Sequence, residues 1–330
     1  MNNQNISKKI LYWYDNNKRE LPWRKKVSKK QKQYFTLVSE FMLQQTQVKT
    51  VIPYFNNFIK KIPSIQKLAN VNNKKLLRCW EGLGYYLRAR NLKKAAQMML
   101  TEFGGKLPDK KEKLIKLPGV GHYTSSAIMA IVFNKPIIPL DGNVERVLKR
   151  VFNLKKEKEI KKENLIEKKS FFGKSKRSGD YAQAIMEIGA LICKPLNPLC
   201  LECPISKNCD SFEKKDFKLK SINKFNKAKY FEANIYQNQN KYLLIKNSKF
   251  KFLRNLFIFP MKEVEKNKFQ SSLNRKINIK MSNMDMKIIL NKKNKMIKPK
   301  NSFLLDKKNI KDQILPTFTK KIFASLNKSI

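Results

Sequence analysis

The sequence predicts a mainly α-helical protein in which a larger helical domain is followed by a smaller α/β domain. Apolar residues recur at helical spacing through residues 34–135, where about six helices are expected and no convincing strand alternation occurs. Residues 213–229 are rich in lysine and poor in large apolar side chains, as is typical of a linker. Short strand-like segments follow, so the predicted domains are residues 1–212 and residues 230–330.

Apolar spacing and end signals place the elements of the first domain. A first helix covers residues 6–14, and the LPWR sequence at residues 21–24 forms a turn. The next helical pattern, residues 34–58, is expected to break at Pro53, because proline lacks a backbone donor. Further helices are expected at residues 65–80, 91–103, 144–151, 155–169 and 181–192, with a glycine-flanked aromatic loop at residues 82–86.

The second domain differs in character. Apolar and aromatic runs separated by turns rich in asparagine and glutamine indicate strands, and the end of the chain has helical spacing. Strands are expected at residues 230–236, 241–245, 256–259 and 281–290, and a terminal helix at residues 317–326.

The stretch of residues 117–143 reads LPGVGHYTSSAIMAIVFNKPIIPLDGN and predicts a helix, a tight turn and a second helix. Pro118 and Gly119 end the first helix, and Thr124 or Ser125 can cap the second. The free N–H groups and the positive end of the second helix suit a phosphate. An ordinary packing corner between two helices would have the same local pattern.

Two carboxylates have settings that suggest chemistry on a nucleic acid. Asp141 lies on a turn just after a buried-looking run. Glu40 lies among Leu37, Val38 and Phe41, so it is either on a solvated stripe of a helix or buried with a raised pKa. The glutamines and threonines that follow it form a polar, uncharged face that suits contact with bases.

The chain is strongly basic, with 72 Lys+Arg against 25 Asp+Glu and a formal net charge of +47. Such a charge attracts polyanions, and DNA or RNA is the first candidate. Lysine, asparagine and isoleucine are abundant throughout, as a compositional bias of the whole genome would also produce. The charge therefore permits nucleic-acid binding without proving it.

Composition also limits the location of the protein. No run of 18 apolar residues occurs, so no membrane span is expected, and the N-terminus lacks an apolar signal core. We expect a cytoplasmic, bacterial-type protein in a reducing environment, used at the nucleoid. His122 is the only histidine, which argues against multi-histidine metal sites and a histidine-based triad.

Four of the five cysteines predict a metal site. They follow the spacing C-x6-C-x2-C-x5-C within seventeen residues, and zinc and a [4Fe–4S] cluster both take four thiolates. Zinc ribbons usually contain two C-x2-C pairs, whereas only one is present, so the spacing favours the cluster. Cys79 stands apart and is expected to be a buried thiol. The expected metal ligands are Cys193, Cys200, Cys203 and Cys209.

The cysteine spacing and the LPGVG…LDGN stretch together resemble the iron–sulfur helix-hairpin-helix DNA glycosylases over about residues 5–212. Within that superfamily, LPWR at 21–24, SEFMLQQTQV at 39–48, GLGYYLRARNL at 82–92 and the long basic C-terminal region resemble the adenine DNA glycosylases (the MutY family). The resemblance implies a two-lobed core, with a six-helix lobe and an iron–sulfur lobe, followed by a Nudix-like domain. It also implies a monomeric base-excision-repair enzyme that removes adenine mispaired with 8-oxoguanine or G in double-stranded DNA.

The resemblance assigns chemical roles to three residues. Glu40 matches the acid that protonates adenine N7, Asp141 the carboxylate that stabilises the sugar cation, and Asn143 its hydrogen-bonding partner. Cleavage of an N-glycosidic bond needs one protonated acid and one ionised carboxylate, which agrees with these roles. The adenine must first be flipped out of the duplex.

The resemblance also implies residues that bind the substrate. Some match positions that line the adenine pocket, some lie at the wedge around the oxidised guanine, and some bind phosphate. The pocket residues are Arg24, Tyr123 and Gln183, the wedge residues are Gln45 and Tyr85 with Leu83 and Thr46 beside them, and the hairpin residues are Gly119, Val120 and Gly121.

Tyr123 separates related activities. Lyase-type relatives such as endonuclease III have a lysine there that forms a Schiff base with the sugar, which tyrosine cannot do. The resemblance therefore implies a monofunctional glycosylase. Endonuclease III-like and T:G mismatch thymine DNA glycosylases are the alternative enzymes. An iron–sulfur DNA-binding protein without catalysis is the alternative outside enzymes, but it would not need Glu40 and Asp141.

Two departures from the family pattern concern DNA recognition. Glu145 follows the DGNV sequence, where relatives commonly have lysine or a neutral residue. The C-terminal domain resembles the Nudix-like domain that recognises 8-oxoguanine, with LFIFP at 256–260 as its best anchor. The family's Phe-Ser-His loop corresponds to Met281-Ser282-Asn283, in which Ser282 keeps a hydroxyl that can recognise the oxidised base.

Overall fold

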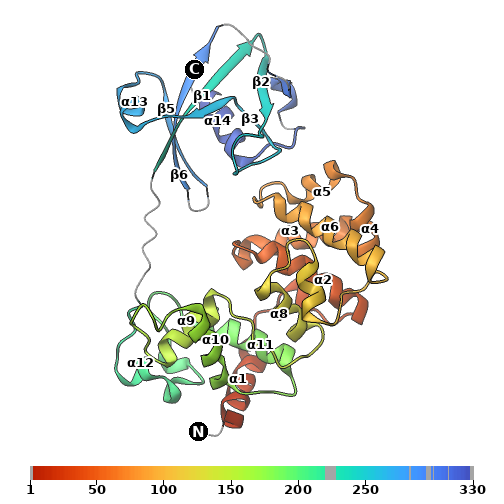
Figure 1. Cartoon of the computed structure of the whole chain (residues 1–330), viewed down its shortest axis with the longest axis vertical. Helices are drawn as coiled ribbons and strands as arrows, with labels where there is room; N and C mark the ends of the chain where they lie inside the picture. The colour runs from red at the N-terminus through yellow and green to blue at the C-terminus, as the bar shows by residue number, and fades with distance from the viewer. Residues whose placement is uncertain are drawn as a thin grey trace. The chain divides into compact units, whose positions relative to one another are not determined.

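The structure is a computed structural model that describes residues 3–219, 228–281, 284–294, 299, 301–310 and 312–327. The chain forms two compact units (Figure 1). The first contains Met1–Val71 and Arg88–Ile222, and the second contains Asn72–Leu87 and Asn223–Ile330. Among the described residues, no helix has both the length and the apolar character needed to cross a bilayer. The predicted domain boundaries at residues 212 and 230 remain a prediction.

The first unit consists of helices joined by short turns. In chain order the helices are α1 (Asn3–Asn17), α2 (Lys29–Leu43), α3 (Val48–Lys61), α4 (Ile65–Asn70), α6 (Leu87–Glu102), α7 (Lys111–Lys116), α8 (His122–Ile131), α9 (Gly142–Val151), α10 (Lys162–Lys168), α11 (Ser178–Glu187) and α12 (Asp210–Glu213). Helix α11 continues into a π-helical turn over Ile188–Ile192, immediately before the cysteines. The mainly helical character of this part was predicted correctly.

The break between α2 and α3 follows Leu43 and does not lie at Pro53, where the sequence predicted it. Pro53 lies inside α3, so the expected break at this residue was wrong. Helix α2 ends at Leu43, and Gln45 has a left-handed φ of 58°. The Arg88 guanidinium accounts for this end, because Nη1 donates to the carbonyls of Phe41 and Met42 at 3.1 and 2.7 Å.

Two other helix boundaries also differ from expectation. Helix α8 begins at His122 after Gly121, so neither Thr124 nor Ser125 caps it. The expected helix at 155–169 shrinks to α10, because the Glu159 carboxylate accepts the N–H groups of residues 155 and 156. Such side chain–backbone bonds stabilise a local turn at the expense of the helix.

A core around α1, α9 and α11 supports the cysteine loop. The buried side chains come from all three helices, and Cys193, Cys203 and Cys209 pack against its edge. Burial of such side chains stabilises a fold by about 1.5–3 kcal/mol each. The core residues from these helices are Ile6, Ile10, Tyr14, Val144, Val147, Leu148, Val151, Tyr181, Ala184 and Ile185.

The second unit contains a mixed β-sheet. Its strands are β1 (Lys229–Asn238), β2 (Lys241–Lys246), β3 (Phe257–Ile258), β4 (Met261–Glu263), β5 (Lys276–Met281), β6 (Met284–Lys293) and β7 (Ser302–Asp306). The strand order is β3-β2-β1-β6-β5, and in addition β4 pairs with β1 and β7 pairs with β2. Strands β1 and β6 run parallel, with Phe231 opposite Ile288. The unit also contains α5 (Asn73–Trp80), α13 (Lys266–Ser271) and α14 (Thr317–Asn327). The sequence predicted β1, β2, β3 and β6 but missed β4, β5 and β7.

Helix α14 packs on the sheet, and polar contacts join α5 to the region around α14. Phe318, Ile322 and Phe323 of α14 belong to the core of the sheet domain. Glu81, directly after α5, forms ion pairs with Arg78 at 2.8 Å and with Lys320 of α14 at 2.7 Å. The aromatic loop that follows Glu81 therefore starts from a residue anchored within this unit.

Gly179→Ala should lower the free energy of unfolding by about 1–3 kcal/mol, the usual cost of overpacking. A Cβ atom at this residue would lie 2.9 Å from the Ala130 carbonyl oxygen and 3.2 Å from the Ile131 Cα, and both are backbone atoms. Thermal unfolding followed by circular dichroism measures the effect. Gly142→Ala is the control, because its Cβ meets no atom within 4 Å. Equal unfolding midpoints for the two variants would contradict the prediction.

Candidate active site

Glu40 is a buried carboxyl group on α2. Only 5% of the residue is exposed, and its Oε2 has no hydrogen-bond partner among the described residues. The pKa of Glu40 is raised to about 7, mainly by burial and also by the nearby Asp141 carboxylate, while Tyr123 and Arg24 act in the opposite direction. Of the two alternatives for Glu40, the solvated helix face is therefore excluded. Near neutral pH this group is able to carry a proton and to release it.

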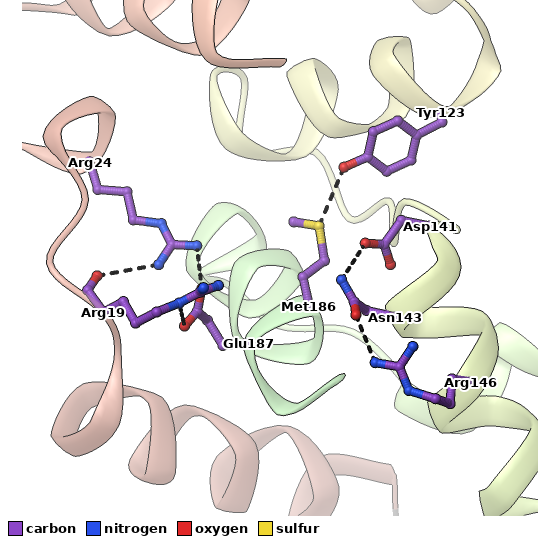
Figure 2. A network of polar contacts seen from close by, with 8 residues as sticks. All are labelled: Arg19, Arg24, Tyr123, Asp141, Asn143, Arg146, Met186 and Glu187. Carbon is purple, nitrogen blue, oxygen red and sulfur yellow. Dashed lines mark hydrogen bonds and ion pairs between the residues drawn. The ribbon is translucent and has the colours of Figure 1, made fainter. Parts of the chain in front are cut away.

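Tyr123 lies on α8 beside this carboxyl. Its hydroxyl is 3.6 Å from the Sδ atom of Met186 on α11 (Figure 2). Burial raises the pKa of Tyr123 well above its ordinary value, and Glu40 and Asp141 add to the effect. The phenol therefore stays neutral and keeps its proton as a potential hydrogen-bond donor.

Asp141 is fixed at the N-terminus of α9. Its Oδ1 accepts the N–H of Val144 at 2.7 Å as an N-cap, and its Oδ2 accepts Nδ2–H of Asn143 at 2.9 Å. Burial raises the pKa of Asp141, whereas these hydrogen bonds lower it. The positive end of α9 favours the anion as well. Asp141 and Glu40 are thus two close carboxyl groups in unlike settings: both oxygens of Asp141 accept hydrogen bonds, whereas Glu40 Oε2 has no partner among the described residues.

Asn143 connects Asp141 to the cysteine loop through Arg146. Asn143 Oδ1 accepts from Arg146 Nη2 at 2.8 Å (Figure 2). The same guanidinium donates to the carbonyls of Gly189 at 2.6 Å and Cys193 at 2.7 Å. Gly189 has to be glycine here, because a Cβ would lie 2.5 Å from the Asn143 Cβ. Helix α9 therefore carries the carboxylate at its start and binds the π-turn and the cysteine loop with its side.

The four predicted thiol ligands come together. Cys193, Cys200, Cys203 and Cys209 line one small cavity. Arg150, which is 2% exposed, donates to Cys193 Sγ at 3.3 Å and to the Lys194 carbonyl at 2.6 Å. Among the described residues, no three His, Cys, Asp or Glu side chains gather in a way that could hold one metal ion. Cys79 is buried, as expected, and belongs to the other compact unit.

A second network surrounds Glu187 on α11. Glu187 is 1% exposed and accepts two hydrogen bonds from Arg19, at 2.7 and 2.8 Å, and one from Arg24 at 2.9 Å (Figure 2). Burial alone would raise the pKa of Glu187, but the two guanidinium groups outweigh it and lower the pKa. Arg24 also lies 5.9 Å from the ring centre of Tyr14. The positive charge of Arg24 also lowers the pKa of Glu40, so Arg24 connects the Glu187 network to Glu40.

The hairpin between α7 and α8 keeps the shape that the sequence indicated. Gly119 has a left-handed φ of 84°, and the Val120 N–H donates to the Leu117 carbonyl at 3.0 Å. The chain then enters α8, whose first N–H groups have no helical acceptor of their own. A Cβ atom at Gly121 would meet no atom within 4 Å, so a backbone or a phosphate can approach this residue.

Comparisons with known proteins show the family of this chain. A family model described as HhH-GPD superfamily base excision DNA repair protein matches residues 38–170. The adenine DNA glycosylase of Buchnera aphidicola subsp. Schizaphis graminum is 38% identical over 283 residues, which cover 83% of this chain and 80% of that protein. The chain belongs to the adenine DNA glycosylase family. The Homo sapiens adenine DNA glycosylase is 41% identical over 211 residues, which cover 61% of this chain and 38% of that protein.

Solved structures support the fold of this family member. A thermostable thymine-DNA glycosylase has a TM-score of 0.56 and 26% identity, and the match covers 64% of this chain and 97% of that one. Endonuclease III in a non-covalent DNA complex has a TM-score of 0.53 and 21% identity, with coverage of 66% and 100%, and shows the fold alone. The predicted fold class is confirmed. As an adenine DNA glycosylase, the protein is a DNA-binding base-excision-repair enzyme.

The remaining predicted residues lie in three places. Gln183 is half-buried on α11, four residues before Glu187, so both are on one face of the helix. Gln45 and Thr46 follow α2. Leu83 and Tyr85 belong to the other compact unit, where Leu83 is 6% and Tyr85 41% exposed, and their part in the site stays a prediction. Ser282 lies outside the described residues.

Sequence reasoning missed several charged residues of this adenine DNA glycosylase. Arg19, Arg146 and Glu187 were not singled out, although each makes at least two of the bonds described above. Glu187 could have been found as the one acid in the apolar YAQAIMEIGALI run. Arg146 had no such signal, because its main partners are backbone carbonyls, which leave no residue pattern.

Glu40→Gln should remove a pH dependence of stability. The folded pKa of Glu40 is raised to about 7 from 4.5, so folded protein binds more protons than unfolded protein between these values. Wild-type stability should therefore fall as pH rises through about 7, and Glu40→Gln should gain about 2–4 kcal/mol relative to wild type at pH 8 but not at pH 4. Urea unfolding at several pH values measures this.

The matched control is Glu102→Gln, which changes an exposed carboxylate on α6. It should leave the pH profile of unfolding unchanged. A Glu40→Gln profile parallel to that of wild type would contradict the buried, neutral state of Glu40.

Proposed function

We propose that the protein hydrolyses the N-glycosidic bond of adenine mispaired with 8-oxoguanine or G in double-stranded DNA, as a monomer without lyase activity. The observation that carries this proposal is the pair of unlike carboxyl groups. Glu40 has a pKa of about 7 and a buried Oε2 without a partner, while Asp141 accepts hydrogen bonds from Val144 and Asn143. Glycoside hydrolysis requires one such acid and one such carboxylate.

Glu40 acts on the leaving base. The protonated carboxyl transfers its proton to adenine N7 while the bond from N9 to the sugar C1′ breaks, so the base leaves neutral. The buried Oε2 supports this role, because a proton on it has no competing acceptor among the described residues. Tyr123 keeps its proton and can donate a hydrogen bond to the carboxylate that forms.

Asp141 acts on the sugar. Its negative charge stabilises the positive charge that develops at C1′, and Asn143 holds its orientation by the bond at 2.9 Å. Water then adds to C1′ and loses a proton to a carboxylate, which leaves an abasic site. Residue 123 is a tyrosine and cannot form a Schiff base, which supports a monofunctional reaction.

Arg24, Gln183 and the Glu187 network form the base pocket in this proposal. The Glu187 carboxylate already binds two arginines, so it can present acceptor and donor groups at fixed positions around the base. Gly119, Val120 and Gly121 bind a phosphate at the start of α8. In this proposal Gln45 and Tyr85 enter the base stack, Thr46 and Leu83 also contact it, and Ser282 contacts the oxidised guanine.

A [4Fe–4S] cluster held by the four loop cysteines is part of the proposal. The donor set fits, because a cluster takes one thiolate at each iron, whereas zinc needs four thiolates about 2.3 Å from one ion. The four thiols line one cavity, which supports a single cofactor held by all of them. Its role would be structural, since it fixes the loop that Arg146 and Arg150 bind. The reducing cytoplasm suits these thiols.

Single-turnover excision on four duplexes tests the reaction. Adenine opposite 8-oxoguanine and opposite G should be released, while T opposite G and thymine glycol should remain intact. Preference for the last two would support the thymine-type alternatives instead. Glu40→Gln should lower the rate at least about 100-fold, within the range of lost general acid catalysis, with DNA affinity unchanged. An active Glu40→Gln variant would refute the assigned acid, and Glu102→Gln serves as the unaffected control.

Metal analysis and visible spectra test the cofactor. Aerobically purified protein should be brown and contain about four irons per chain, as expected for a four-thiolate cluster. Cys209→Ser should lose iron and colour together. Cys79→Ser, the same substitution outside the loop, should keep both. A colourless protein with one zinc per chain would overturn the cluster assignment.

A further inference from the structure

Three segments of the first unit meet where α2 ends. They are the last turn of α2, the first turns of α6 and the turn between α7 and α8. A Cβ on Gly119 would lie 2.7 Å from Phe41 Cε1 on α2 and 2.9 Å from Asn91 Cβ on α6. The hairpin turn is therefore pressed against both helices, with no space for a side chain at its tip.

Gln44 bonds across this junction. Its Nε2 donates to the Gly119 carbonyl at 3.2 Å and to Thr124 Oγ1 at 3.4 Å. One acceptor is in the hairpin turn and the other is in the first turn of α8. The residue next to Gln44 in the chain is Gln45, the predicted wedge. A single amide thus links the phosphate-binding hairpin to the segment that enters the base stack.

Arg88 holds the other side of the same segment. Its guanidinium, on a residue that is 7% exposed, donates to the carbonyls of Phe41, Met42 and Gln44 and to Thr46 Oγ1, at 2.5–3.1 Å. These bonds terminate α2 and bracket Gln45, whose φ of 58° is unusual for a residue with a side chain. The main chain that carries Gln45 is thus fixed on both sides.

We propose that Gln44 is a positioning residue for base flipping: it transmits the position of the DNA phosphate at the hairpin to Gln45. The inference rests on the proposed function, since it takes the hairpin as the phosphate site and Gln45 as the wedge. When the hairpin binds the DNA backbone, the amide of Gln44 determines where the turn between α2 and α3 lies against the stacked bases. Without the Gln44 amide, the hairpin and Gln45 can each bind DNA, but the position of one no longer determines the position of the other.

A purely structural role would predict something else. If Gln44 only stabilised the fold, its loss would lower stability and leave the flipping step unchanged in folded protein. If it positions the wedge, its loss slows excision of a paired adenine more than of an adenine that is already unpaired. The ratio of the two excision rates separates these roles.

Gln44→Met tests the inference, because methionine has a similar length and no N–H donor. Single-turnover excision is measured on adenine opposite 8-oxoguanine in a full duplex and on adenine within an unpaired bubble. We expect about five- to tenfold slower excision in the duplex, the effect of one misplaced hydrogen-bonded contact, and less than twofold in the bubble. Fluorescence of 2-aminopurine at the adenine position should rise correspondingly more slowly in the duplex.

Gln97→Met is the matched control. Its Nε2 donates to the Ala69 carbonyl at 3.2 Å, so the same kind of bond is lost elsewhere in the first unit. Equal behaviour of the two variants, or equal slowing on both substrates, would overturn the role of Gln44. Absence of adenine release by the wild-type protein would instead refute the proposed function.

Discussion

Helix α9 is the element on which the site depends. Its N-terminus holds Asp141 through the N-cap bond to Val144, and its side holds the cysteine loop through Arg146 and Arg150. A helix is stiff over ten residues, so the carboxylate and the loop have a fixed separation. Arginine is suited to this because one planar guanidinium can bind several carbonyls at once. The cysteine loop therefore helps to hold Asp141 in place through Arg146 and Asn143.

Glu40 is buried in a setting that makes its ionised form unfavourable. A buried carboxyl without a donor on Oε2 costs free energy whenever it ionises. The rest of α2 compensates, since Leu37, Val38 and Phe41 are completely buried around it. Asp141 lies close enough to raise the Glu40 pKa. Burial raises the pKa of Asp141 as well, and the hydrogen bonds from Val144 and Asn143 oppose that rise. Hydrophobic packing thus supports the electrostatic difference that the proposed reaction needs.

Local patterns predicted the parts of the protein that local forces determine. The cysteine spacing placed four thiols at one cavity, and the PGVG turn placed a hairpin. Tertiary contacts explain the failures. Helix α2 ends because Arg88, far along the chain, binds its carbonyls, and Pro53 is accommodated inside α3 instead. Thr124 does not cap α8, because the helix already begins at His122, and its hydroxyl accepts a hydrogen bond from Gln44 instead. Tertiary partners of this kind leave no recognisable spacing pattern in a sequence. The role of Arg146 was missed for the same reason.

The neutral residues around the carboxyl pair are as important as the charged ones. Tyr123 is buried beside Glu40 and hydrogen-bonds to it, and its hydroxyl also lies 3.6 Å from the Met186 sulfur, a weak acceptor. Its raised pKa means that it keeps a proton at any pH at which Glu40 titrates. A lysine at residue 123 would instead pair with Glu40, hold it ionised and lower its pKa, which removes the proton that a leaving base requires. The tyrosine therefore preserves the acid as well as excluding a Schiff base, and the two consequences follow from the same uncharged side chain.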